Sequence, residues 1–520
     1  MPPLNFGNPT IRLALPSEFS SEAALLSYLQ ISPAELKKIW WHRARMYEKF
    51  PLGIAPRKIR TISAPDARLK HLQRKIAYLL NGLYRVRHPV HGFVAGKSVK
   101  SNAEAHLRRR YILNLDLKDF FPSISERRVS GVLEALGVST RVSEIIARIC
   151  TNEGSLPQGA PSSPVLSNII CFRLDKELMA FSKVARCIYT RYADDITLSS
   201  HQPMNAIFEG GVPAPGRFPV DILKVNLKNT IERNGFTINA EKAHYADRNS
   251  RRMVTGLKVN ELVNVDRRFV RNVRAALFSV QRLGPEKAQE KFTVAHGGAS
   301  DLAAHLAGKI SWLRFIRGQS DPVYRSLALR FNAVYPGRSV TILPTAQEVR
   351  DRSTWVVEHD AAMGSAFFLK GVGLVTAAHC VEGVECVEIY HASKFANRFP
   401  ATVVKRDKDL DLAVLSHTIP VTEYYELERA ITAPAVGDET TAIGYPSFGF
   451  GDVLNVREGK ISSFAVQHGI KLIEVTQKLA QGMSGGPLLS QTDQVIGVIH
   501  KGGPFEPRDF AIRIDEIDKL

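Results

Sequence analysis

Hydrophobic and polar positions follow two different patterns along the chain. Over roughly the first two thirds, apolar repeats with helical spacing alternate with short apolar runs that are typical of strands. The pattern predicts helices over 22–30, 69–80 and 220–234, and strands over 111–117 and 188–198. Such a mixture of elements predicts an α+β fold.

Beyond residue 350 the pattern changes. Short β-rich runs with Gly and Pro turns between them occur at 367–376, 401–404, 412–415, 441–444, 472–476 and 495–500. Many short strands separated by turn residues predict an all-β domain, in this case a pair of barrels.

These patterns divide the chain into parts. Tyr335-Pro-Gly-Arg-Ser interrupts the preceding helical pattern, so a linker is expected after it. We expect a helical extension over 1–50, an α+β region over 51–258 and a basic helical region over 259–335. The linker follows over 336–350 and the all-β domain over 351–520.

Composition and charge narrow the possible functions. A chain of 520 residues with 44% hydrophobic and 23% charged residues is expected to form several packed domains, which excludes one small module and a disordered protein. Residues 1–340 carry 52 Lys and Arg against 27 Asp and Glu, whereas 341–520 carry 17 against 24. Only the first part therefore has the excess of cations that suits a nucleic-acid backbone.

Several absences in the sequence favour a cytoplasmic protein. The 5 cysteines are too few for a disulfide framework and show no paired C-x-x-C zinc pattern. The first residues lack the cationic start and apolar core of a secretory signal, and no apolar run reaches the length of a membrane span. No membrane partner is expected.

Three aspartates interrupt apolar strand patterns. Asp116 ends the string Leu113-Asn-Leu-Asp, and Asp194 and Asp195 stand at an expected hairpin turn in a later strand. A buried carboxylate is costly without a compensating cation, and converging carboxylates repel one another unless a metal such as Mg²⁺ neutralises them. Two Mg²⁺ ions at such a site would support phosphoryl transfer to a nucleotide.

The string Tyr192-Ala-Asp-Asp, preceded by an aspartate strand, resembles the reverse transcriptases over residues 55 to about 330. The resemblance implies a right-hand polymerase, with fingers and palm over 51–258 and a helical thumb over 259–335. It also implies that Asp116, Asp194 and Asp195 are the catalytic ligands of a two-Mg²⁺ site.

Further motifs extend the resemblance to the residues that bind the incoming nucleotide. Leu156-Pro-Gln-Gly-Ala-Pro matches the family's nucleotide-facing loop, which implies that Gln158 and Gly159 lie against the dNTP. Phe121 falls at the steric-gate position that rejects a 2′-OH, although core packing is the alternative for Phe120 and Phe121. Lys242 matches a lysine that can protonate pyrophosphate. The remaining dNTP-binding candidates are Arg57, Lys58 and Arg60, for which a surface charge cluster is the alternative.

Two short strings indicate the kind of reverse transcriptase. Ser101-Asn-Ala-Glu-Ala-His and Met253-Val-Thr-Gly resemble signatures of the retron enzymes. The resemblance implies a bacterial enzyme that uses its own structured noncoding RNA as template and primes from the 2′-OH of a guanosine, producing branched msDNA. The implied RNA-binding residues are Asn102, His106, Val254, Thr255, Gly256, Arg267, Arg271 and Arg274, and a solvated charged face is the alternative for the arginines.

The all-β part contains a second set of reactive residues. His379 follows a strand pattern, Asp411 lies in Asp409-Leu-Asp-Leu-Ala, and Ser484 lies in Gly482-Met-Ser-Gly-Gly. A serine hydroxyl becomes nucleophilic when an imidazole takes its proton and a carboxylate orients that imidazole. The chain order of histidine, aspartate and serine resembles the trypsin-like proteases over about 350–520.

This second resemblance implies roles for the three residues. His379 would be the general base, Asp411 its orienting carboxylate with Asp409 as the rival, and Ser484 the nucleophile. The amides of Gly482 and Ser484 would form the oxyanion hole.

The resemblance also indicates where the specificity pocket lies. Its base would hold Lys478, six residues before the serine, and His500 and Lys501 lie on its expected wall strand. These cations predict cleavage after Asp or Glu, with solvent exposure as the alternative for Lys501.

Taken together, the two resemblances imply a retron reverse transcriptase fused to a serine protease effector in antiphage defence. Its expected partners are the noncoding RNA, msDNA, dNTPs and a protein substrate. The alternative is a non-retron reverse transcriptase with an inactive protease-fold module that binds a partner.

Overall fold

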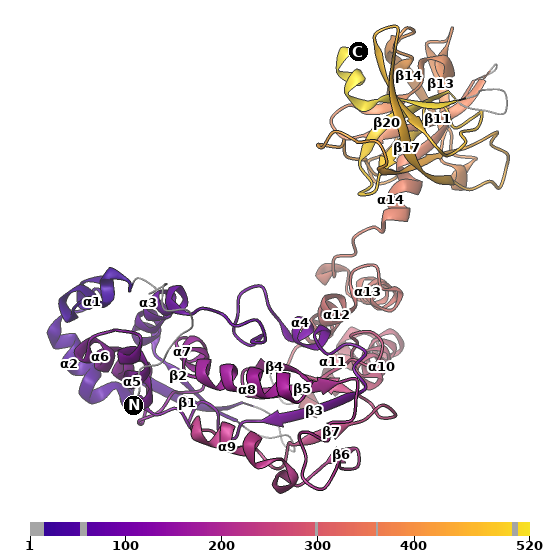
Figure 1. Ribbon diagram of the computed structural model, residues 1–520. Coiled ribbons are helices and arrows are strands. Elements are labelled where there is room, and N and C mark those ends of the chain that lie inside the picture. Colours follow the sequence, from indigo (N-terminus) through magenta and orange to yellow (C-terminus); the bar gives the residue numbers. More distant parts are fainter. Residues whose placement is uncertain (1–14, 53–59, 297–299, 360–361, 502–507) are drawn as a thin grey trace. The chain divides into compact units, whose positions relative to one another are not determined.

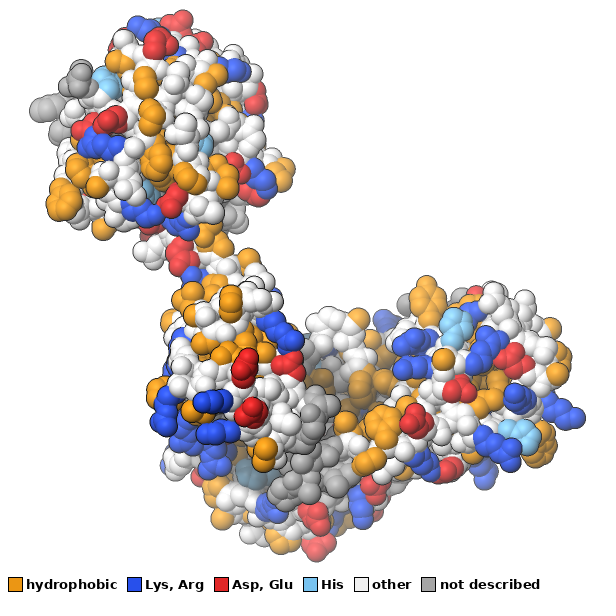
Figure 2. Space-filling view, turned by 180° about the vertical axis from the view of Figure 1, so that it is seen from behind, with side chains coloured by type: hydrophobic (Ala, Val, Ile, Leu, Met, Phe, Trp, Pro, Cys, Tyr) orange, Lys and Arg blue, Asp and Glu red, His pale blue; other side chains and the backbone are white. Residues whose placement is uncertain are grey.

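The computed structural model describes residues 15–52, 60–296, 300–359, 362–501 and 508–520. The chain divides into two compact units, unit 1 at Met1–Ile342 and unit 2 at Leu343–Leu520. Each unit is described by itself below. Figure 2 shows many Lys and Arg side chains on the visible face of unit 1, whereas the visible face of unit 2 mixes both signs.

Unit 1 begins with two short helices, α1 (Glu22–Leu29) and α2 (Pro33–His42). The Ser32 hydroxyl accepts a hydrogen bond from the Glu35 amide at 3.1 Å, which satisfies one of the free N–H groups at the start of α2. Each helix buries apolar side chains in the core of the unit, among them Leu25 of α1 and Ile39 of α2. The helix expected over 22–30 is confirmed.

The centre of unit 1 is a five-stranded antiparallel sheet with the order β4-β5-β3-β7-β6. Its strands are β3 (Tyr111–Asp116), β4 (Ile188–Tyr192), β5 (Asp195–Ser200), β6 (Gly216–Arg217) and β7 (His244–Ala246). The apolar side chains of β3, among them Leu113 and Leu115, are buried in the core beneath the sheet. The expected strand over 188–198 is a hairpin of β4 and β5, as its Asp-Asp turn indicated.

Helices flank this sheet and form the adjoining part of unit 1 (Figure 1). They are α3 (Ala67–Leu83), α4 (Val99–Glu104), α5 (Glu126–Ala135), α6 (Thr140–Cys150), α7 (Ser163–Ile170), α8 (Phe172–Val184) and α9 (Val225–Arg233). Two hairpins, β1 (Tyr47–Leu52) with β2 (Arg60–Pro65) and β8 (Met253–Val254) with β9 (Leu257–Lys258), complete this part. The expected helix over 220–234 is shorter than predicted, because a 3₁₀ turn at Val220–Ile222 precedes α9.

The remaining part of unit 1 is helical, as expected for 259–335. It consists of α10 (Arg267–Leu283), α11 (Pro285–His296), α12 (Leu302–Arg317) and α13 (Pro322–Val334). Leu277, Leu306, Ile310 and Phe331 are buried in a core of their own that also takes in Val254 from the β8–β9 hairpin.

Unit 2 opens with a helix that begins inside the expected linker, 336–350, and continues beyond it. α14 (Ala346–Ser353) begins at a capping box, in which Thr345 and Glu348 each bond the other's backbone amide. The remainder is all-β, which confirms the predicted fold class of an α+β region followed by a double-barrel domain.

The two barrels of unit 2 are closed antiparallel sheets. The first contains β10 (Thr354–His359), β11 (Ala362–Leu369), β12 (Gly373–Thr376), β13 (Cys386–Tyr390), β14 (Phe399–Asp407) and β15 (Leu412–His417). The second contains β16 (Glu439–Gly444), β17 (Asn455–Gln467), β18 (Ile470–Val475), β19 (Pro487–Ser490), β20 (Val495–Lys501) and β21 (Asp509–Arg513). Phe367 of the first barrel and Ile443 of the second share one buried core, so the barrels pack against each other.

Among the residues that the structure describes, no helix is both long and apolar enough to cross a membrane.

Candidate active sites

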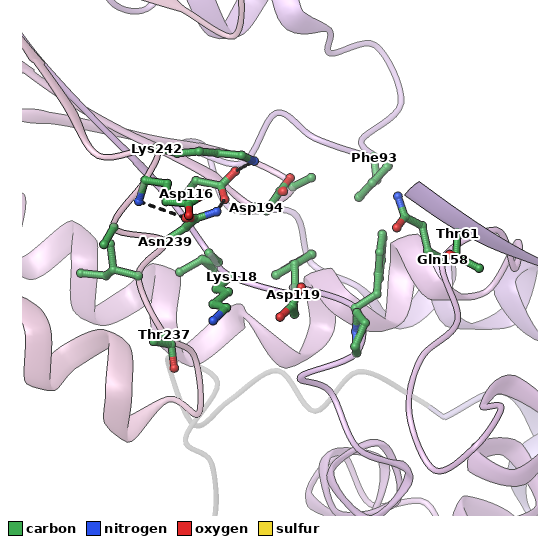
Figure 3. A pocket seen from close by; sticks show the side chains of 18 residues that line it. Thr61, Phe93, Asp116, Lys118, Asp119, Gln158, Asp194, Thr237, Asn239 and Lys242 are labelled. Atoms are coloured by element: carbon green, nitrogen blue, oxygen red, sulfur yellow. Dashed lines mark hydrogen bonds and ion pairs between the residues drawn. The ribbon is translucent and has the colours of Figure 1, made fainter. Parts of the chain in front are cut away.

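A cavity of about 710 Å³ opens at the ends of the central strands of unit 1. Asp116 ends β3 and pairs directly with Asp195, the first residue of β5. Asp194 occupies the hairpin turn before it and lines the cavity together with Asp116 (Figure 3). The antiparallel register therefore brings the three sequence-predicted aspartates to one end of the sheet.

Asp116 is the most buried of these carboxylates, with 4% of its surface exposed. The Lys242 ammonium lies 2.5 Å from Oδ2, and the Asn239 side-chain amide donates to Oδ1 at 3.0 Å. Both partners come from the segment after α9 and converge on Asp116 (Figure 3). The sequence singled out Lys242 but missed Asn239, although the latter lies three residues earlier in the same string.

These carboxylates suit a divalent metal. Carboxylate oxygens are the hard ligands that Mg²⁺ prefers, and Asp116 and Asp194 face the same cavity. The Lys242 ammonium on Asp116 shows that a positive charge is stable at this position. Asp116 and Asp194, with Asp195 from the adjoining strand, could therefore hold the metal.

The expected nucleotide-binding residues lie around the same cavity where the structure describes them. Phe121 and Gln158 line it, and the Phe121 ring lies 6.1 Å from that of Phe93, a cavity residue that the sequence did not indicate. Both Phe120 and Phe121 line the cavity, but Phe120 is 5% exposed and packs in the core, whereas Phe121 is the more exposed of the two.

Gly159 lies next to Gln158 with φ +129, and a Cβ there would lie 2.9 Å from the Ser63 carbonyl oxygen of β2. Glycine is thus required for the loop to pack on this strand. Of the three basic candidates, Arg57 and Lys58 lie outside the described residues, and only the backbone of Arg60 is described, at the start of β2.

The RNA-binding role predicted for residues of the two retron-like strings needs a correction. Asn102, His106 and Val254 are each 0% exposed, which excludes direct contact of these side chains with RNA. His106 instead lies between β5 and β4, where its ring nitrogens are 2.6 Å from the Ser199 hydroxyl and 2.7 Å from the Thr190 hydroxyl. Thr255 and Gly256 form the turn of the β8–β9 hairpin, and Gly256 is exposed there.

The basic residues expected to contact RNA are on the surface. Arg267, Arg271 and Arg274 are exposed on α10 at spacings that place them on one face of the helix. Phe278 continues this face and is 59% exposed. The sequence did not indicate this aromatic residue, because its helical spacing alone is equally typical of a core position.

In unit 2, the structure brings His379 and Asp411 together. Asp411 precedes β15 with φ +51, and its carboxylate accepts hydrogen bonds from the His379 amide at 2.9 Å and from His379 Nδ1 at 2.8 Å. Asp409, the rival carboxylate, is exposed.

The electrostatics of this pair are strongly perturbed. The hydrogen bond to Asp411, with a further one to Cys380, raises the pKa of His379 to about 10. Burial by itself would raise the pKa of Asp411, but the hydrogen bonds from His379 and His500 outweigh it and lower that pKa to about 2. Asp411 is therefore a carboxylate throughout the neutral range.

Ser484 lies in a loop of the second barrel that the first barrel holds in place. Ser365 of β11 donates from its hydroxyl to the Gly482 carbonyl at 2.8 Å and from its amide to the Ser484 carbonyl at 2.9 Å. Gly482 has φ +91, and a Cβ there would lie 2.6 Å from the Tyr445 carbonyl oxygen, so only glycine fits.

The structure corrects the expected specificity residues. His500 does not act as a wall cation: its Nδ1 lies 2.6 Å from Asp411 Oδ2, and its carbonyl accepts a hydrogen bond from the Ser484 hydroxyl at 3.4 Å. Lys478 lies 3.0 Å from the buried carboxylate of Asp509, so its charge is compensated. The predicted preference for cleavage after acidic residues consequently loses two of the cations on which it was based. The side chain of the third, Lys501, is not described.

Within the described residues, His379, Asp411 and His500 also form a group in which the nitrogen and oxygen atoms that could bind a metal lie within 4.8 Å of one another. The hydrogen bonds of both histidines to Asp411 explain this closeness. The five cysteines are free.

Comparison with known proteins finds a family match in each unit. Residues 48–259 match the model of the reverse transcriptases (RNA-dependent DNA polymerases), and residues 364–498 match that of the trypsin-like peptidase domain. The second region is also 31% identical over 144 residues to the Protease Do-like 2 of Arabidopsis thaliana, which covers 26% of this chain and 23% of that protein.

Two curated relatives of unit 1 are retron enzymes. The chain is 32% identical over 315 residues to the Retron Mx162 reverse transcriptase of Myxococcus xanthus, covering 55% of this chain and 64% of the relative. It is 33% identical over 273 residues to the Retron Ec86 reverse transcriptase of Escherichia coli, covering 52% of this chain and 75% of the relative. The reverse transcriptase family in general implies the use of a divalent metal. The chain therefore belongs to the retron reverse transcriptases, and a trypsin-like peptidase domain follows its polymerase region.

Proposed function

We propose that unit 1 copies its own structured noncoding RNA into branched msDNA, starting from the 2′-OH of a guanosine, and that unit 2 is a serine endopeptidase. The two activities together would serve antiphage defence in the bacterial cytoplasm, with the peptidase as the effector. The observation that carries the polymerase assignment is the pairing of Asp116 with Asp195 beside a cavity that Asp194 and Lys242 line.

The polymerase residues have separable roles. Asp116, Asp194 and Asp195 would hold two Mg²⁺ ions, which supply charge stabilisation of the attacking hydroxyl and the leaving pyrophosphate when bound. Phe121 would exclude a ribose 2′-OH, and Gln158 would contact the nucleotide. Lys242 would release Asp116 on metal binding and donate a proton to pyrophosphate.

The peptidase residues would act together in proton transfer from the serine hydroxyl. His379 would take the proton of the Ser484 hydroxyl as that oxygen attacks the peptide carbonyl. Asp411 holds His379 through Nδ1, which leaves Nε2 as the basic atom. The amides of Gly482 and Ser484 would stabilise the oxyanion, and the glycine-dependent backbone at Gly482 supports this assignment.

RNA binding is assigned to the α10 face and the β8–β9 turn. The exposed Arg267, Arg271 and Arg274 would contact phosphates, and Thr255 and Gly256 are accessible to the RNA. This assignment rests on exposure and charge and on the retron relatives.

The decisive experiment is to sequence the nucleic acid that co-purifies with the protein. A retron product shows a DNA of defined sequence joined to RNA by a 2′–5′ branch, and the D194N/D195N variant should lack it. Unbranched DNA or heterogeneous RNA would favour a non-retron reverse transcriptase instead.

A fluorophosphonate probe tests the peptidase separately. Labelling of the full-length protein that is abolished in S484A supports an active peptidase. If the folded protein is not labelled under any condition that perturbs msDNA, unit 2 is better explained as an inactive module that binds a partner.

A further inference from the structure

A fully buried ion pair lies beneath the metal-binding turn of unit 1. Arg191, one residue before Tyr192-Ala-Asp-Asp, donates from Nε to Asp175 Oδ1 and from Nη2 to Asp175 Oδ2, both at 2.8 Å. Both side chains are 0% exposed. Burial by itself lowers the pKa of Arg191, but Asp175 outweighs it and holds that pKa well above its ordinary value, so the guanidinium stays charged.

The guanidinium has further partners that connect it to the turn. Its Nη1 donates to the Ala193 carbonyl at 3.1 Å, and its Nη2 donates to the Asn168 side-chain oxygen at 3.1 Å. The Asn168 amide in turn donates to the Gly92 carbonyl at 3.0 Å. Gly92 packs so closely on the turn that a Cβ there would lie 2.3 Å from the Ala193 nitrogen.

The turn needs such support because of its backbone. Ala193 has φ +56, a left-handed conformation that costs a non-glycine residue free energy and persists only where the surroundings impose it. Ala193 precedes both Asp194 and Asp195. A change in its conformation would therefore displace two of the three carboxylates.

The network also reaches the nucleotide-facing loop. Asn168 belongs to α7, which follows Gln158 and Gly159 after a short connection, and Asp175 belongs to α8, which packs on β4 (Figure 1).

We propose that Arg191 is a positioning residue of the polymerase site, which holds the Ala193 turn in its left-handed conformation and thereby places Asp194 and Asp195 for metal binding, with Asp175 and Asn168 orienting its guanidinium. This inference rests on the proposed polymerase function. It assigns Arg191 no contact with substrate or metal.

The test replaces Arg191 by lysine in the full-length protein. Lysine keeps the charge opposite Asp175, but its single nitrogen cannot occupy the three separate donor positions from which the guanidinium reaches Asp175, Ala193 and Asn168. R191K should lower the rate of DNA synthesis at least tenfold and weaken Mn²⁺ binding, measured by electron paramagnetic resonance, at least threefold. The matched control is R43K, which changes another buried arginine, hydrogen-bonded to Thr151 and Glu126, and should leave Mn²⁺ affinity unchanged.

A second set of variants separates positioning from folding. In Y189F/D175L/R191M, apolar side chains replace the whole ion pair and the Tyr189 hydroxyl that donates to it, so no buried charge is left unpaired and the protein is expected to stay folded, which its melting temperature measures. This variant should nevertheless lose Mn²⁺ affinity and DNA synthesis as R191K does. Adding A193G to R191K should restore part of both, because glycine adopts the left-handed conformation without a penalty.

Wild-type Mn²⁺ affinity and synthesis in both R191K and the apolar variant would overturn the inference. Absence of Mn²⁺ binding and of synthesis in the wild type would instead contradict the proposed polymerase function.

Discussion

At the scale of single residues, the carboxylate of Asp411 has two imidazole partners, His379 at 2.8 Å and His500 at 2.6 Å. The side chain of Asp411 is 11% exposed, so water cannot readily replace a missing donor. His500 therefore supports the orientation of Asp411 and, through it, that of His379.

Two substitutions of His500 test this role. His500→Asn keeps an N–H donor near the position of Nδ1, whereas His500→Leu removes it. Removal of one hydrogen bond to a buried charged group costs about 1.5–3 kcal/mol, so the leucine variant should label with a fluorophosphonate roughly 10–100-fold more slowly than wild type. The asparagine variant should stay within about threefold, and equal rates for the two variants would contradict this role.

The raised pKa of His379 predicts how activity depends on pH. A general base must be neutral, and His379 is protonated below a pKa of about 10. The labelling rate of Ser484 should therefore rise as the pH increases toward 10. Asp411→Asn removes the carboxylate that raises this pKa, so the midpoint should move to lower pH while the maximal rate falls on the order of 10⁴-fold. A wild-type rate that declines above pH 7 would contradict the assignment.

At the scale of elements, His106 joins two strands of the central sheet. Burial lowers the pKa of this histidine to about 3, so it is neutral while it bridges Ser199 of β5 and Thr190 of β4. Since the unfolded chain binds a proton near the ordinary pKa of 6.5 and the folded one does not, this residue lowers stability as the pH falls from 6.5 toward 3.

His106→Leu should act on stability and not on RNA affinity. The variant leaves two buried hydroxyls without their partner, which is expected to cost about 1–3 kcal/mol in the free energy of unfolding. Denaturant unfolding measures this destabilisation, and RNA binding of the folded fraction should match wild type. A selective decrease in RNA affinity at unchanged stability would favour a direct role in recognition.

The exposed face of α10 predicts two distinguishable effects on RNA binding. For each arginine–phosphate interaction that R271Q/R274Q removes, the slope of log affinity against log salt should fall by about 0.7–0.9. Phe278→Ala should weaken binding by about 1–3 kcal/mol because it removes a ring on which a base can stack, with little change in that slope. Filter binding at several salt concentrations measures both, and R141Q on α6 serves as the surface control.

At the scale of the whole molecule, a reverse transcriptase region and a trypsin-like peptidase domain are joined in one chain, and each unit has cores of its own. Mutations at one site should therefore leave the chemistry at the other intact. S484A should retain branched msDNA but lose phage protection, whereas D195N should lose both. Plating efficiency of phage and extraction of msDNA measure these outcomes, and full protection by S484A would exclude the peptidase as effector.

Much of this organisation could be predicted from the sequence. The change in hydrophobic period near residue 350 reports the move from α+β to all-β architecture, because periodicity depends on neighbours along the chain. Strings such as Tyr192-Ala-Asp-Asp and Gly482-Met-Ser-Gly-Gly indicate chemistry through residue types at close spacing, and their partners Asp116 and His379 were found in the same way.

The tertiary structure alone decided which side chains meet across long separations. Packing buries Asn102 and His106, turns His500 from the expected pocket wall to Asp411, pairs Lys478 with Asp509 and places Arg191 beneath Ala193. The local sequence of a polar residue does not reveal its burial or its partner, because both depend on segments that only folding brings together. The sequence by itself thus determined the families, the elements and the reactive groups. The packing of those elements determined which other side chains orient the reactive groups.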